Sequence, residues 1–251
     1  MDQASIDKAA DFLIAIRDSG NRVGRMPDAL RPTDVDEANA IQDAVAARRG
    51  DTIGGWKVML TPEGLWFHGN MLKSRCYSSG AEVPSRLMGL LGIEVEIAFR
   101  FERALQPRAT DYTEAEVAEA ASAFVGIEIL DRAFIDPKPT TVWERTADSI
   151  TNGGFVSGTV REDWRALGDD DVTASLIVNG EVKVRKSGDA PGKTPLHRAT
   201  GLVNVMRKRH GVAVGQIVTC GTYTGADYFK PGDHIRGEFD GFGFVEFTFS
   251  K

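Results

Sequence analysis

The chain has 251 residues, of which 42% are hydrophobic, and this is enough to bury the core of a full-sized globular domain. Its net charge of -6 argues against broad binding to nucleic-acid backbones, which depends on clustered Lys and Arg. No run approaches the about 20 apolar residues that a membrane helix needs, so neither nucleic acid nor a membrane is expected as a partner.

The N-terminus and the cysteines bear on the cellular compartment. Residues 1–8 lack the basic start and the apolar stretch of a signal peptide. Cys76 and Cys220 could form one bridge, but a chain of this length and composition does not need one, so two reduced thiols are expected. The predicted location is therefore the cytoplasm.

Helical patterns dominate the first fifty residues. Residues 5–19 carry apolar side chains close to the i, i+3, i+4 spacing of an amphipathic helix, and Gly20 follows as a stop. A second helix is predicted with Thr33 as its N-cap and Gly50 at its end. This part of the chain is therefore predicted to form a helical N-terminal arm.

From Gly54 onward, short apolar runs separated by glycines predict β-strands. Two further helices interrupt them. One is predicted from Thr113 to about Val125, because Thr113 and a glutamate three residues later can form a capping box. The other begins at Thr194, which precedes a proline, and ends before Gly211.

The β part of the chain also contains a turn with a specific signature. Asn179-Gly180 lies between two apolar runs, which predicts a tight hairpin with a type I′ turn. Residues 244–249 alternate again like a strand. The prediction is a single α+β domain over residues 1–251, with a helical arm (1–50) and a mixed β core (51–251) that carries the chemistry.

Three glutamates are the most informative residues of the chain. A strand places successive side chains on opposite faces, so Glu94 and Glu96 share one face. Glu128 lies in an equally apolar run, where a carboxylate needs a partner to offset its desolvation. Carboxylates without Cys or His ligands select hard cations, so Mg²⁺ or Mn²⁺ is predicted here. Three oxygens on an octahedral ion leave positions open for a chelating substrate and a water molecule.

Each of these charged residues also has a simpler interpretation. Glu94 and Glu96 could lie on a solvated strand face, and Glu128 could form a buried salt bridge to Arg132. Lys57 precedes an apolar run, where burial is predicted to lower its pKa toward the range useful for proton transfer. Alternatively, its side chain extends from a strand end into solvent.

Several short motifs follow one another along the chain in a specific order. They are Arg31-Pro32, Gly55-Trp-Lys57, Ile93-Glu-Val-Glu-Ile-Ala98, Gly126-Ile-Glu-Ile-Leu-Asp131, residues 147–158, residues 221–225 and Pro231-Gly-Asp233. In this order they resemble the fumarylacetoacetate hydrolase superfamily, and within it the 2-keto-4-pentenoate hydratase and 4-oxalocrotonate decarboxylase branch. The resemblance covers nearly the whole chain.

The resemblance implies a mixed β-roll core of the fumarylacetoacetate hydrolase type. It implies a Mg²⁺ or Mn²⁺ ion on Glu94, Glu96 and Glu128, with Lys57 as the catalytic residue that moves protons. The implied substrate is a small 2-oxo or 2-hydroxydienoic acid that chelates the ion. The residues implied to bind this substrate are Phe67, Asp131, Asp148, Thr151 and Thr222.

The expected function is a metal-dependent lyase of aromatic catabolism, most simply a 2-hydroxypenta-2,4-dienoate hydratase. The substrate wall departs from the branch, since Ser149 follows Asp148 where an asparagine is usual. A 4-oxalocrotonate-type decarboxylase, an acylpyruvate C–C hydrolase and a non-catalytic homologous subunit therefore remain alternatives. The hydrolase would need a general base, for which His68 is the candidate. A homo-oligomer is expected, and assembly with a homologous lyase is a further option.

Overall fold

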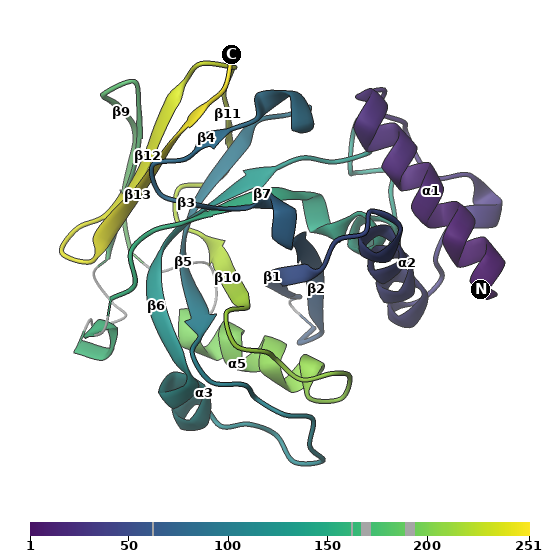
Figure 1. The fold of residues 1–251 in the computed structure, drawn as a ribbon, viewed down its shortest axis with the longest axis horizontal. Helices are drawn as coiled ribbons and strands as arrows, with labels where there is room; N and C mark the ends of the chain where they lie inside the picture. The colour runs from purple at the N-terminus through teal and green to yellow at the C-terminus, as the bar shows by residue number, and fades with distance from the viewer. Residues whose placement is uncertain (62, 162, 167–171, 189–193) are drawn as a thin grey trace.

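The fold consists of two β-sheets, a pair of N-terminal helices and further helices that lie later in the chain (Figure 1). This computed structural model describes residues 1–251 except 62, 162, 167–171 and 189–193. Within the described residues, no helix has the length and apolar character needed to cross a membrane.

The predicted helical arm is confirmed as α1 (Gln3–Ser19) and α2 (Val35–Arg48). The N-cap of α2 is Asp34 and not Thr33, because the Asp34 carboxylate accepts a hydrogen bond from the Glu37 amide. The Thr33 hydroxyl instead donates to the Glu37 side chain. The two helices lie side by side at one end of the molecule (Figure 1).

The arm is attached to the β core through a small apolar cluster of its own. This cluster joins both helices to the segment after β6 (Ala121–Leu130) and to the end of α4 (Val142–Ala147), and its buried members are Ala9, Leu13, Met26, Ala38, Ile41, Ala133, Phe134 and Ala147. Burial of apolar surface in this cluster fixes the arm against the part of the core that leads to the site described below.

The larger sheet has the strand order β2-β1-β10-β5-β6-β7-β3, and β11 pairs with β5. Its strands are β1 (Ile53–Leu60), β2 (Trp66–Leu72), β3 (Cys76–Ser78), β5 (Gly92–Phe101), β6 (Ala121–Leu130), β7 (Asn152–Ser157), β10 (Ile217–Thr222) and β11 (Asp227–Tyr228). Parallel pairs (β1 with β10, β3 with β7) occur among antiparallel ones, so the predicted mixed sheet is confirmed.

The smaller sheet has the order β4-β13-β12-β8-β9. Its strands are β4 (Glu82–Val83), β8 (Thr173–Val178), β9 (Glu181–Ser187), β12 (His234–Phe239) and β13 (Gly243–Phe249). Asn179 (φ 52°) and Gly180 (φ 85°) join β8 to β9, as the type I′ turn requires.

The two sheets pack against each other over the odd-numbered face of β5 and β6. A methyl group added at Gly237 of β12 would lie 2.8 Å from Val95 and 3.2 Å from Ile127. Val95 and Ile127 are fully buried in the main apolar core. Since strand side chains alternate, the even-numbered residues of β5 and β6 point away from this core. Glu94, Glu96 and Glu128 are therefore on the face that the smaller sheet leaves free.

Helix α3 (Glu114–Ala120) is shorter than predicted. Its predicted capping box, formed by Thr113 and Glu116, is confirmed. The helix ends at Ala120 and not near Val125, because the next ten residues pair with β5 along its whole length. Sheet pairing therefore overrides the local helical pattern, as tertiary context often does.

Helix α4 (Val142–Ala147) was not predicted. It has six residues, too few to show a helical period in the sequence, although Thr141 and Glu144 form a capping box at its start. Helix α5 (Pro195–Met206) begins at Thr194-Pro195, as predicted, and Thr194 is its N-cap. The short 3₁₀ turns are η1 (Asp28–Leu30), η2 (Lys73–Arg75), η3 (Ser85–Leu87), η4 (Ser149–Thr151) and η5 (Trp164–Ala166).

Gly126 of β6 lets the Phe155 ring pack directly on the strand. A methyl group added there would lie 2.3 Å from Phe155 Cζ. Gly126→Ala is therefore expected to lower the free energy of unfolding by about 1–3 kcal/mol through overpacking. Urea denaturation measures this. Gly24→Ala is the control, because nothing lies within 4 Å of a methyl group there. Equal stability of the two variants would contradict this account of the packing.

Candidate metal centre and active site

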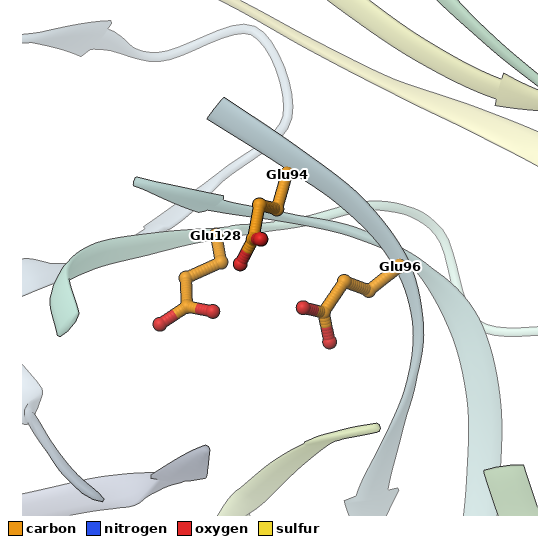
Figure 2. Close-up of side chains that lie close together, drawn as sticks. All are labelled: Glu94, Glu96 and Glu128. Carbon is orange, nitrogen blue, oxygen red and sulfur yellow. The ribbon is translucent and has the colours of Figure 1, made fainter. Parts of the chain in front are cut away.

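The three glutamates meet on one face of two paired strands. Glu94 and Glu96 are on β5, and Glu128 on β6 pairs directly with Glu94. Directly opposed residues of an antiparallel pair share a face. One carboxylate oxygen of each residue lies within 4.8 Å of those of the other two. Figure 2 shows the three carboxylates turned toward the same space. We call these residues the glutamate cluster.

Burial makes this cluster unfavourable without a cation. Glu96 and Glu128 are fully buried, whereas the Glu94 side chain is 13% exposed. Burial, together with repulsion between the neighbouring carboxylates, raises the pKa values of Glu96 and Glu128. Within the described part of the chain, Glu96 Oε1 has no hydrogen-bond partner. A buried carboxylate oxygen without a donor needs a positive charge nearby, so the donor set fits a hard divalent cation.

Lys57 on β1 lies against the glutamate cluster. Its Nζ is 2.8 Å from Glu128 Oε2 and 3.2 Å from Glu94 Oε2. Burial disfavours the ammonium, but the surrounding carboxylates outweigh it and raise the Lys57 pKa. The sequence-based prediction that burial lowers the Lys57 pKa is therefore wrong for the chain without a bound cation. The sequence places Lys57 in an apolar run but does not show that three carboxylates face it.

Three hydrogen-bond donors that the sequence analysis did not single out orient the glutamates. The Gly221 amide (2.6 Å) and the Thr219 hydroxyl donate to Glu96 Oε2, and the Asn152 side-chain amide donates to Glu128 Oε1 (2.9 Å). Thr219 is fully buried on β10 between apolar neighbours. In the sequence, a polar Thr219 within an apolar run is the pattern that could have indicated a buried hydrogen-bond donor. Hydrogen bonds of this kind fix the orientation of metal-binding carboxylates.

Two of the predicted substrate-binding residues lie near Lys57 or the glutamates. Thr222 pairs with Glu96, and its hydroxyl accepts from the Gly225 amide. Phe67 lies on the same face of the β1–β2 hairpin as Lys57, because Lys57 pairs with Gly69 and Phe67 is two residues away. The Phe67 ring packs edge-on against Trp143. Both positions are compatible with a substrate wall.

The predicted substrate residues Asp131 and Asp148 instead bind arginines from the N-terminal arm. Asp148 accepts from Arg17 Nε (2.7 Å) and from the Ala133 amide (2.8 Å). Asp131 accepts from the Gly89 amide (3.2 Å) and lies 3.3 Å from an Arg22 nitrogen. Both carboxylates are therefore occupied by protein donors.

The remaining predicted substrate residue, Thr151, has an unusual backbone. Its φ is 64°, in the left-handed region, and its hydroxyl donates to the Ile150 carbonyl. The Thr151 carbonyl accepts from the Asp131 amide at 2.9 Å. Thr151 thus belongs to a tightly constrained turn between Asp148 and Asn152.

His68 does not face the glutamate cluster. In the β1–β2 hairpin it pairs with Val58, whereas Lys57 pairs with Gly69, so His68 points to the opposite face from Lys57. It is 1% exposed, and its Nε2 lies 3.4 Å from Arg209 Nη1. The role of general base predicted for His68 therefore has no geometric support. The sequence could not show which face of the hairpin each residue takes.

The buried His68 ring makes stability depend on pH. Burial, and then the charges of Arg209 and His210, lower the His68 pKa to about 3. In the unfolded chain the pKa of this histidine is about 6.5. Just below pH 6.5, His68 therefore binds a proton in the unfolded chain but not in the folded one. The stability that neutral His68 provides is therefore lost as the pH falls below 6.5, by about 1.4 kcal/mol per pH unit until the folded pKa is reached.

His68→Leu is accordingly expected to flatten the loss of stability between pH 6.5 and 4.5, because leucine does not titrate. Urea denaturation at several pH values measures the slope. The half-buried His234 on β12 of the smaller sheet provides the control, and His234→Gln should not flatten the slope in this way. A wild-type slope in His68→Leu would mean that His68 is not a buried neutral ring.

The fold and the site together define a β-rich protein in which three carboxylates meet on one sheet face beside a lysine. The family described as fumarylacetoacetate (FAA) hydrolase C-terminal matches residues 71–250. The chain therefore belongs to this family, and the resemblance identified in the sequence is confirmed.

Several known proteins are similar over nearly the whole chain. A 2-keto-4-pentenoate hydratase of Paraburkholderia xenovorans is 25% identical over 98% of this chain and 95% of its own length. 2-Keto-4-pentenoate hydratase 3 of Pseudomonas putida has the same identity and coverage. The solved 4-oxalocrotonate decarboxylase of Pseudomonas putida, complexed with magnesium and adipate, is 19% identical with a TM-score of 0.85, over 99% of this chain and 98% of its own. These similarities confirm the predicted fold.

Proposed function

We propose that the protein is a divalent-metal-dependent lyase that hydrates a small 2-hydroxydienoic acid such as 2-hydroxypenta-2,4-dienoate. The observation that carries the proposal is the contact of Lys57 with the glutamate cluster, which combines a cation site with a proton-bearing group. Two relatives of nearly equal length that are named 2-keto-4-pentenoate hydratases support this substrate class.

Mg²⁺ is the proposed physiological ion, and Mn²⁺ is the proposed substitute. Glu94, Glu96 and Glu128 would hold it, since all three present oxygen atoms to one space and hard cations prefer oxygen. A related fold was solved with magnesium. When bound, the cation supplies positive charge that stabilises the oxygen of an enolate formed from a 2-oxo acid.

The residues of the chain have distinct roles in this proposal. Lys57 Nζ, which lies 2.8 Å from Glu128 Oε2 and 3.2 Å from Glu94 Oε2, would move the protons: it delivers one to a carbon of the dienol as the enol hydroxyl loses its own, and water then adds across the remaining double bond of the keto form. Thr219 and the Gly221 amide fix the orientation of Glu96. Phe67 and Thr222 would line the space next to Lys57 and Glu96 and orient the substrate there.

Decarboxylation of a 4-oxalocrotonate-type dicarboxylate is the second candidate. It is favoured by the high TM-score to 4-oxalocrotonate decarboxylase over almost the full length of both chains. The chemistry would use the same cation site, because an enolate also forms when CO₂ leaves a 2-oxo acid. C–C hydrolysis is disfavoured, because the base proposed for it, His68, points away from Lys57.

A substrate panel tests the proposal. Chelator-treated protein is given Mg²⁺ or Mn²⁺ and then 2-hydroxypenta-2,4-dienoate or 4-oxalocrotonate, and both loss of ultraviolet absorbance and release of CO₂ are followed. The expected result is cation-dependent consumption of the dienoate without CO₂. Faster CO₂ release from 4-oxalocrotonate would favour the decarboxylase. Tight cation binding without any turnover would indicate a non-catalytic subunit.

A further inference from the structure

The turn between α4 and β7 has an unusual backbone. Ser149, Ile150 and Thr151 have φ values of 53°, 49° and 64°, and none of them is glycine. Non-glycine residues in the left-handed region are strained, and three in a row persist only where the surrounding structure holds them. Such strain makes the conformation of this turn depend on contacts from outside it.

Arg17 of α1 provides such contacts at both ends of the turn. Its Nε donates to Asp148 Oδ1 (2.7 Å) and its Nη2 to the Asp148 carbonyl (2.8 Å). Its Nη1 donates to the Asn152 carbonyl (2.8 Å). The Arg17 side chain is 18% exposed and that of Asp148 only 2%, so these bonds are largely shielded from water. One planar guanidinium thus bridges the residues that flank the strained turn.

The far side of the turn touches the glutamate cluster and the strand next to Lys57. The Asn152 side-chain amide donates to Glu128 Oε1 at 2.9 Å. The Ser149 carbonyl packs so closely on Gly69 that a methyl group there would lie 2.1 Å from it. Gly69 is the residue paired with Lys57. The position of the turn is therefore coupled to the side chains that face the cation site.

We propose that Arg17 is a positioning residue that sets cation affinity from the N-terminal arm. It holds the strained turn so that Asn152 stays hydrogen-bonded to Glu128, which keeps the Glu128 carboxylate aimed at the cation. This inference rests on the cation site of the proposed function. It adds that the helical arm is a functional part of the site, although Arg17 does not touch the glutamate cluster.

Cation affinity of the full chain tests the role of Arg17. Arg17→Met removes all three hydrogen bonds at nearly constant length, and it is expected to weaken Mn²⁺ binding about 10-fold in calorimetry, the lower range for loss of groups that orient metal ligands. Arg17→Lys keeps the charge but cannot span three oxygens, so it is expected to weaken binding as well. If Arg17→Met does not fold, Arg17→Lys is the deciding variant.

Arg49 offers a matched control. It also belongs to the arm, its side chain is 23% exposed, and its guanidinium donates to the Asp18 carboxylate of α1. Arg49→Met removes an arm ion pair but none of the three hydrogen bonds that Arg17 makes to the turn, so it is expected to leave Mn²⁺ affinity unchanged. Thermal unfolding of the cation-free proteins shows how much each variant destabilises the arm itself.

A double-variant cycle tests the route through Asn152. If Arg17 acts through that residue, Arg17→Met combined with Asn152→Ala should weaken Mn²⁺ binding no more than Asn152→Ala alone. Additive losses would overturn the route. Unchanged Mn²⁺ affinity in folded Arg17→Met and Arg17→Lys would overturn the proposal while leaving the cation site intact. A wild-type chain that binds no Mn²⁺ would instead refute the proposed function.

Discussion

Glu128→Gln is expected to weaken Mn²⁺ binding by at least about 100-fold and to abolish cation-dependent turnover. Loss of a group that merely orients a metal ligand costs about 10–100-fold in affinity, so loss of the ligand charge itself should cost more. Glu128 is fully buried and pairs directly with Glu94, so no neighbouring water can take its place without rearrangement. Calorimetry on folded protein measures the affinity.

Glu144→Gln is the matched control for this variant. Glu144 is also fully buried, but its carboxylate pairs with Arg25 of the N-terminal arm at 2.6 Å. Its replacement should lower stability and leave Mn²⁺ affinity near the wild-type value. Full Mn²⁺ affinity in Glu128→Gln would show that the glutamate cluster is not the cation site.

Lys57→Met is expected to lower turnover by about 10²–10⁴-fold, the usual contribution of a positioned acid or base. Cation affinity should not fall. Lys57 carries a positive charge 2.8 Å from Glu128 and 3.2 Å from Glu94, so its removal leaves more negative charge for the cation. The combination of lost turnover and retained or tighter Mn²⁺ binding separates a proton-transfer role from a structural one.

The exposed Lys230 provides the control for Lys57, and Lys230→Met should leave both turnover and affinity unchanged. Steady-state kinetics at saturating Mg²⁺ and calorimetry with Mn²⁺ supply the two readouts. Wild-type turnover in Lys57→Met would show that Lys57 does not take part in catalysis.

The parts of the site that follow from local periodicity could be predicted from the sequence. Strand alternation places Glu94 and Glu96 on one face, and the apolar surroundings of Glu128 indicate a buried carboxylate in need of a partner. That Glu128 lies directly opposite Glu94 depends on the pairing of β5 with β6. The chemistry of the carboxylates and the order of the family motifs both predict that these residues share one ion, but neither gives this pairing.

The parts that depend on pairing register or on distant charges could not be predicted. The hairpin register decides that His68 faces Arg209 while Lys57 faces the glutamates. The raised pKa of Lys57 depends on carboxylates 37 and more residues away. Arg17 and Asp148 are 131 residues apart in sequence, so no local pattern shows their contact. The predicted homo-oligomer stays a prediction.

The most direct test is the rate of 2-hydroxypenta-2,4-dienoate consumption by chelator-treated protein as Mg²⁺ is added. We expect no turnover without the cation and a rate that saturates with the same midpoint as Mg²⁺ binding in calorimetry, at one ion per chain. A rate that does not depend on Mg²⁺, or saturated Mg²⁺ binding without consumption of the dienoate, would contradict a cation-dependent hydratase built on Glu94, Glu96 and Glu128.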